Sequence, residues 1–258
     1  MKRRTFVQAS VAALCTVAGG RAADAKPTAA ELFELRTYTL KPAKRALLED
    51  YLAQAFIPAL RRLAVGPVGA FAEAPEKDLQ RQTVLIVHKT AESAMSWSTK
   101  LAADGEYARA AKAYFAATAD DPVYLRIESS LLSGIAGMPN LERGDPSKPR
   151  LFNLRIYESH NERAAAKKIE MFEKGELAVF RSVGLTPVFF ASALAGSAMP
   201  NLTYMLAFPD EAGRKAAWDK FRSNPEWLRL KAIPEYADKE IVSKVTNRIL
   251  TPLAFSEI

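Results

Sequence analysis

Arginine and tyrosine recur two residues apart in two short stretches that share the pattern Phe-x-Leu-Arg-x-Tyr. The first pair is Arg36 and Tyr38, and the second is Arg155 and Tyr157. Arginine supplies a permanently charged, planar set of hydrogen-bond donors, and tyrosine supplies a flat ring with one polar tip. Side chains of these types that face one cavity would hold a small anionic or aromatic molecule.

Strand geometry decides which side chains can meet in such a cavity. Alternate residues of a strand share a face, so Phe33 is expected on one face and Arg36 on the other. We expect the apolar face to lie under helices and the mixed face to look into the space between two sheets. The candidate pocket residues on that mixed face are Arg36, Tyr38, Arg126, Arg155 and Tyr157.

The same arginines have a structural alternative. Glu34 and Glu128 lie on the same mixed faces, and ion pairs with them would hold the two halves together without any ligand. Breaking a buried pair of this kind costs about 3–5 kcal/mol, so such arginines can be essential for folding alone. Both interpretations stay open at the level of the sequence.

The two arginine-tyrosine stretches belong to an internal repeat. Phe33 to Tyr38 matches Phe152 to Tyr157, and Trp97 matches Trp218, with a nearly constant offset of about 120 residues. Within the first copy, helical periodicity covers Ala43–Leu63 and Ala91–Ala102, between short alternating strands. Each copy therefore follows the order strand, helix, strand, strand, helix, strand, which is typical of a ferredoxin-like unit.

Two such units in one chain predict an architecture. A four-stranded sheet with helices on one face leaves the other face bare, and two bare faces can pack together. The predicted fold class is α+β, with two tandem ferredoxin-like βαββαβ domains packed as an intramolecular dimeric α/β barrel. We predict domains at residues 32–133 and 151–257, and a linker rich in Gly and Pro at residues 134–150.

Residues 1–25 have the composition of an export signal. Basic residues including Arg3 and Arg4 are followed by a short apolar stretch and by Ala23-Asp-Ala25. The adjacent arginines favour the twin-arginine type, and an ordinary secretory signal is the alternative. We expect a periplasmic or secreted protein after cleavage.

Composition excludes several classes of function. The chain has 258 residues, of which 49% are hydrophobic and 25% charged, with one Cys and two His. These counts argue against a disulfide framework and a multi-histidine metal centre, so no metal site is expected. The net charge of +7 has no basic runs behind it, so we expect no nucleic-acid partner, and the apolar stretch is too short for stable membrane insertion. A homo-oligomer is left open.

The strand-opening block Glu34-Leu-Arg-Thr-Tyr38, its repeat at residues 152–157 and the segment Val65–Phe71 resemble the NIPSNAP family. The resemblance extends over residues 32–257 and implies the dimeric α/β barrel fold. It carries no catalytic residues, because the family has none established. The wider superfamily includes cofactor-free monooxygenases, haem enzymes and small-molecule binders.

These observations support one leading hypothesis and two rivals. The leading hypothesis is an exported protein that binds a small anionic or aromatic molecule between the two sheets. The rivals are a cofactor-independent monooxygenase or isomerase-like enzyme that holds an enolate or phenolate, and a non-catalytic interaction scaffold. We expect no cofactor, and haem is a minority alternative that the scarcity of histidine disfavours. Whether the protein is an enzyme is not decided by the sequence.

Overall fold

The structure is a computed structural model that describes residues 29–145 and 147–258, so the expected export signal lies outside the described residues. The first half has the expected order of elements, with each helical layer divided into short pieces. Its elements are β1 (Leu32–Leu40), η1 (Pro42–Lys44), α1 (Arg45–Tyr51), η2 (Leu52–Phe56), α2 (Ile57–Arg62), β2 (Val68–Glu73), β3 (Gln80–His88), α3 (Ala91–Ala102), α4 (Gly105–Ala110), α5 (Lys112–Phe115) and β4 (Arg126–Gly134).

The second half repeats this order. Its elements are β5 (Leu151–Glu158), α6 (Glu162–Met171), η3 (Phe172–Glu176), α7 (Leu177–Val183), β6 (Thr186–Ala195), β7 (Asn201–Phe208), α8 (Glu211–Ser223), α9 (Pro225–Lys231), η4 (Pro234–Tyr236), α10 (Asp238–Ile241) and β8 (Lys244–Pro252).

Equivalent helices of the two halves begin with equivalent side chains. Thr90 accepts a hydrogen bond from the backbone N–H of residue 93 at the start of α3, and Asp210 does the same for residue 213 at α8. Asp104 and Asn224 cap α4 and α9 in turn. Each side-chain oxygen satisfies backbone donors that the first helical turn leaves free, which fixes where the helix begins.

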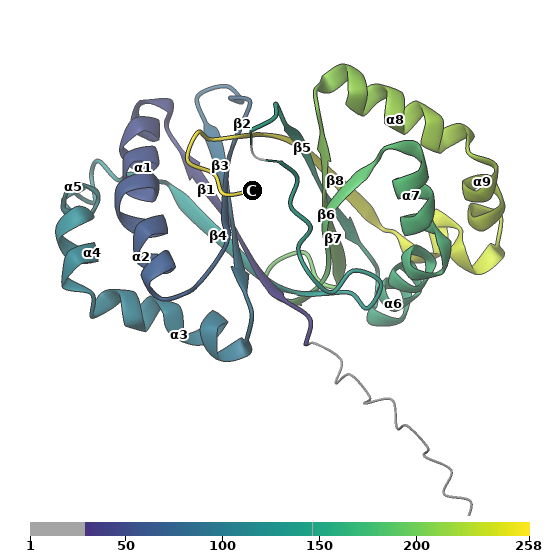
Figure 1. The fold of residues 1–258 in the computed structure, drawn as a ribbon, viewed down its shortest axis with the longest axis horizontal. Coiled ribbons are helices and arrows are strands. Elements are labelled where there is room, and N and C mark those ends of the chain that lie inside the picture. The colour runs from purple at the N-terminus through teal and green to yellow at the C-terminus, as the bar shows by residue number, and fades with distance from the viewer. Residues whose placement is uncertain (1–28, 146) are drawn as a thin grey trace, which may run out of the picture.

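The eight strands close into one barrel in the order β1-β3-β2-β8-β5-β7-β6-β4, and every neighbouring pair is antiparallel. The pairs β2–β8 and β4–β6 join the two halves, and the helices of each half lie outside its own strands (Figure 1). The predicted fold class is therefore confirmed: two tandem ferredoxin-like units form an intramolecular dimeric α/β barrel.

Much of the barrel interior is an apolar core, and at one end Arg248 binds Thr37, Thr83 and Glu73. Buried side chains from both halves meet in this core, including Phe33, Leu35, Phe152, Leu154 and Phe189. The rings of Phe33 and Phe189 stack across the halves with their centroids 5.0 Å apart. The interior of an eight-stranded barrel is just wide enough for side chains to fill. A ligand site is therefore expected in the layers between the strands and the helices.

Candidate functional site

The predicted orientation of the arginine-tyrosine pairs, facing the space between the two sheets, is wrong. The apolar residues Phe33 and Phe152 fill the barrel interior, whereas Tyr38 and Tyr157 belong to the cores between each sheet and its own helices. Arg36, Tyr38, Arg155 and Tyr157 lie instead in the helix–sheet layers, where their apolar parts are covered and their polar tips still find partners.

In the first half, Arg36 belongs to a polar network around Glu34. The carboxylate lies 3.3 Å from Nε of Arg36, accepts from Nε1 of Trp97 at 2.9 Å and accepts from Oγ of Ser129 at 3.1 Å. Burial acts to raise the pKa of Glu34, but His88, Arg36, Ser129 and Trp97 together hold it below its usual value. Arg36 is thus paired within β1 of the first half, and this ion pair does not join the two halves.

The space beside this network is small and lined by aromatic rings. A pocket of about 320 Å³ lies between β1 and α1–α5, and it contains Tyr38, Tyr51, Trp97 and Tyr114. Tyr51 stacks on Tyr114 with ring centroids 3.7 Å apart and shares a 2.8 Å hydrogen bond with Tyr107. Aromatic packing therefore occupies most of the volume that the arginine faces.

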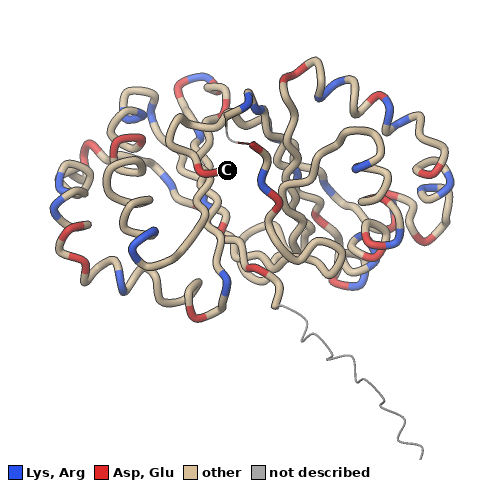
Figure 2. Tube along the Cα trace, in the orientation of Figure 1, with Lys and Arg blue, Asp and Glu red and all other residues tan. Residues whose placement is uncertain are grey.

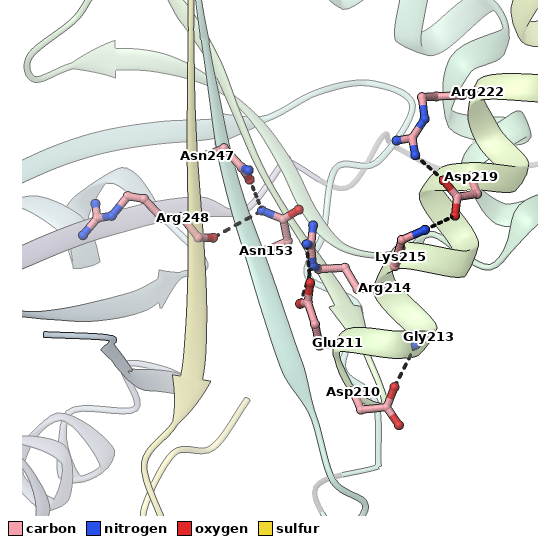
Figure 3. A network of polar contacts seen from close by, with 10 residues as sticks. All are labelled: Asn153, Asp210, Glu211, Gly213, Arg214, Lys215, Asp219, Arg222, Asn247 and Arg248. Atoms are coloured by element: carbon pink, nitrogen blue, oxygen red, sulfur yellow. Dashed lines mark hydrogen bonds and ion pairs between the residues drawn. The ribbon is translucent and has the colours of Figure 1, made fainter. Parts of the chain in front are cut away.

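In the second half, Asn153 takes the place of Glu34, and the network is different. The Asn153 amide donates from Nδ2 to Oδ1 of Asn247 at 2.6 Å and to the backbone oxygen of Arg248 at 3.2 Å, so it turns toward β8 (Figure 3). Arg155 keeps the position of Arg36 and stacks on Trp218, with Cζ 4.8 Å from the ring centroid. Within the described part of the chain, the buried Nε1 of Trp218 has no acceptor.

The second half also has a larger cavity. About 680 Å³ lies between β5, β8 and the helices α6 and α8–α10, bounded on one side by Arg155, Tyr157 and Trp218 and on the other by Trp227 and Phe221. We call this space the second-half cavity. It combines flat apolar walls with a few converging polar groups, which is the usual composition of a small-molecule site.

The charge of this lining is strongly positive. Seven of the residues around the second-half cavity are basic and two are acidic. Figure 2 shows both signs interspersed along the outer helices, and α8 neutralises its own cations through Glu211 and Asp219 (Figure 3). Lys168, Lys239 and Lys244 also have carboxylate partners. Among the described residues, Arg155 alone in this lining has none.

Tyr157 is tied to the same guanidinium. Its hydroxyl oxygen accepts from Nε and Nη2 of Arg155 at 3.2 and 3.1 Å, and from the hydroxyl of Tyr204 at 2.9 Å. Burial raises the pKa of Tyr204 well above its usual value, so this phenol stays a donor. No described residue accepts the Tyr157 hydrogen. The phenol is therefore a hydrogen-bond donor available to a molecule in the cavity.

Two further residues of the lining escaped prediction from the sequence. Lys168 of α6 and Glu176 of η3 form an ion pair with Nζ 3.0 Å from Oε2, and each side chain is only 2% exposed. Nζ also lies over the rings of Tyr157 and Phe172, 5.2 and 4.8 Å from their centroids. An alignment of the two copies of the repeat would have identified both residues, because the equivalent residues of the first half are apolar.

Arg126 does not join the other candidates. Its side chain is exposed, and it lies on the face of β4 opposite to Ile127, which borders the first-half pocket. Among the residues that the structure describes, no three metal-ligating side chains come together, and no helix has the length and hydropathy to cross a membrane. Arg36 and Tyr38 lie in one pocket and Arg155 and Tyr157 in another, so the predicted set is divided between two places.

Comparisons with known proteins bear on the second half directly. The NIPSNAP family profile matches residues 152–257, which contain Arg155, Tyr157, Lys168 and Glu176. The second half of this chain is therefore similar to NIPSNAP domains. The strands β5–β8 and the helices that enclose the second-half cavity all fall within the matched residues, apart from the first residue of β5. No curated protein sequence matches the chain.

Solved structures that cover most of the chain have a similar fold. A candidate monooxygenase from Fusobacterium nucleatum superposes with a TM-score of 0.54 at 8% identity, covering 87% of this chain and 93% of that chain. A candidate monooxygenase from Lactobacillus acidophilus gives 0.54 at 8%, covering 86% and 94%. An anthrone oxidase-like protein gives 0.52 at 8%, covering 86% and 91%. At these identities the likeness shows only that the architecture is shared.

Proposed function

We propose that the second half of the chain binds a small, flat organic molecule through a negatively charged oxygen in the second-half cavity. One observation carries the proposal. In the first half, the Glu34 carboxylate serves both the guanidinium of Arg36 and the indole N–H of Trp97. In the second half, Arg155 and Trp218 keep these positions, and within the described residues neither has a carboxylate.

A carboxylate, enolate or phenolate oxygen of a ligand would complete this arrangement. Buried charges and buried donors are stable only when they are paired, and a guanidinium is best paired by an anionic oxygen. Trp227, Tyr157 and Phe221 offer flat surfaces to the rest of such a molecule. The proposed ligand is of the class predicted from the sequence. Its proposed binding site lies between the second sheet and its helices, and not between the two sheets.

The test is a binding titration of the full chain with 2-naphthoate, followed by tryptophan fluorescence and calorimetry. The neutral isostere 2-naphthamide is expected to bind more weakly. Arg155→Met is expected to weaken 2-naphthoate binding by about 10- to 100-fold, since a hydrogen bond to a charged group contributes about 1.5–3 kcal/mol.

Arg126→Met is the matched control, because it removes an exposed arginine outside the cavity. It should leave the dissociation constant unchanged. Equal affinity of wild type and Arg155→Met for 2-naphthoate, or no binding at all, would contradict the proposal. An enzyme of the monooxygenase or isomerase type is the second candidate function, and the buried pair of Lys168 and Glu176 favours it.

We also propose that the protein is exported, on the basis of Arg3-Arg4 and the apolar stretch that follows. Replacing both arginines by lysine should trap the protein inside the cell if the twin-arginine route carries it. Cell fractionation and the mass of the N-terminal peptide measure this. Unchanged export of the double variant would favour the ordinary secretory route.

A further inference from the structure

The buried ion pair of the second half has no counterpart in the first. The π-helical turns η2 and η3 occupy equivalent places in the repeat, and with the same offset Lys168 replaces Leu48 and Glu176 replaces Phe56. Leu48 and Phe56 are both fully buried in the first core. The same fold is thus stable with an apolar pair at these two places.

A buried ion pair is a poor substitute for apolar packing as far as stability is concerned. Desolvation of two charges offsets most of their attraction, and replacing such a pair by apolar residues is often neutral or stabilising. The pair of Lys168 and Glu176 is nonetheless placed against the second-half cavity, beside the ring of Tyr157. Its position therefore points to chemistry in that cavity.

The hydrogen bonding of Glu176 leaves it able to accept a proton. Nζ of Lys168 binds Oε2, and Oε1 makes no hydrogen bond to any described residue. Burial raises the pKa of Glu176 above its usual value, although Lys168 acts against this. A carboxylate in such surroundings is a stronger base than an exposed one, and the neighbouring ammonium favours its ionised form.

The candidate oxyanion donors border the same cavity. Arg155 Cζ is 5.3 Å and Lys168 Nζ is 5.2 Å from the centre of the Tyr157 ring. Arg155 and Lys168 therefore lie beside the same ring, and Glu176, the partner of Lys168, lines the same cavity. This arrangement places a base at one part of a ligand and charge-stabilising donors at another.

We propose that Glu176 removes a proton from a carbon next to the carbonyl group of a flat cyclic ketone bound in this cavity. This inference rests on the proposed function and names its substrate class. The C–H bond breaks, its proton goes to Oε1 of Glu176, and its electron pair forms an enolate. The negative charge that develops on the former carbonyl oxygen is held by Arg155, Trp218 and Tyr157. The step is reversible and consumes no other reactant.

The experiment follows exchange of the methylene hydrogens of 2-indanone for deuterium by NMR, with the full chain in deuterated buffer. Wild type is expected to accelerate exchange over buffer. Glu176→Gln should lower the enzymatic rate by about 100-fold or more, the usual contribution of a positioned base. Glu173→Gln is the matched control, because this exposed residue belongs to the same turn, and its rate should equal that of wild type.

Binding of 2-naphthoate separates this inference from the proposed function. Glu176→Gln should bind it as tightly as wild type, and 2-naphthoate should inhibit exchange at its own dissociation constant. If Glu176→Gln does not fold, the double variant Lys168→Leu/Glu176→Phe carries the residues of the first half, and it should fold without exchange activity.

Three results would overturn the inference while the proposed function stands: no exchange by a wild type that binds 2-naphthoate, full exchange in the folded Glu176 variant, or exchange that saturating 2-naphthoate does not inhibit. A wild type that neither binds 2-naphthoate nor exchanges 2-indanone would remove both.

Discussion

Replacing Lys168 by Leu and Glu176 by Phe in one chain gives the second half the residues that the first half has at Leu48 and Phe56. The two single variants break a pair whose members are each 2% exposed. Lys168→Leu should destabilise the protein by about 3–5 kcal/mol, because it leaves a buried carboxylate without its ammonium. In a chain of this size the melting temperature should fall by about 6–20 °C.

The double variant should behave in the opposite way. Exchange of a buried pair for apolar side chains is neutral or stabilises by about 1–4 kcal/mol. Its melting temperature is therefore expected at or above that of wild type, although each single change lowers it. Thermal unfolding by circular dichroism and urea titration measure all four proteins, and the double-mutant cycle isolates the coupling between the two positions.

The pH dependence of Lys168→Leu adds a second check. Burial already raises the pKa of Glu176, and loss of the ammonium raises it further. The protonated carboxyl costs less to bury. The difference in unfolding free energy between Lys168→Leu and wild type should therefore shrink as the pH falls toward the usual carboxyl range. A double variant as unstable as the singles would show that the pair is needed for packing, and the argument for chemistry at Glu176 would lose its basis.

Other properties follow from the same network. Arg36→Met should destabilise the protein by about 3 kcal/mol or more, because it leaves Glu34 buried without its guanidinium. Arg155→Met should change the urea midpoint little. Equal losses of stability in the two variants would contradict the inferred difference in ion pairing between the two halves. Burial raises the pKa of Tyr38 to about 12 from 10.0, so its contribution to stability is complete below pH 10.0 and is lost as the pH rises through about 12. Tyrosinate absorbance should therefore lag behind that of free tyrosine in alkali, and coincidence with free tyrosine would contradict this burial. Ile258→Ala should cost about 2–5 kcal/mol in urea unfolding, because Ile258 lies in the barrel core, and an unchanged midpoint would place it outside.

The elements and their arrangement could be predicted from the sequence because periodicity and repetition are local signals. The helix predicted at Ala91–Ala102 has the observed bounds of α3, and the repeat led directly to two units and a barrel. The orientation of the strands could not be predicted in the same way. Phe33 and Tyr38 lie on opposite faces of β1 and are 0% and 1% exposed, so both faces carry fully buried side chains. Alternation shows which residues share a face, and without a solvated face it does not show which way that face looks.

The candidate site was predicted in part for a related reason. Arg155 and Tyr157 stand in a recognisable strand pattern, and both border the second-half cavity. Lys168 and Glu176 lie in a helix rich in charged residues, where a lysine and a glutamate usually mark the solvated side. The π-helical turn η3 comes between them and changes the helical phase, so that both point inward. Their alignment with Leu48 and Phe56 was the one sequence signal of burial.

The closed barrel also affects how the protein can change through mutation. A barrel assembled from two identical subunits obeys twofold symmetry, so each substitution occurs twice and its cost in stability is doubled. Here both seams, β2–β8 and β4–β6, lie within a single polypeptide. One copy can therefore keep a tightly packed aromatic layer while its twin accepts buried charges. Because the two copies are fused in one chain, one copy can specialise in stability and the other in polar chemistry. An unfavourable polar group can then persist in one copy because the other holds the barrel closed.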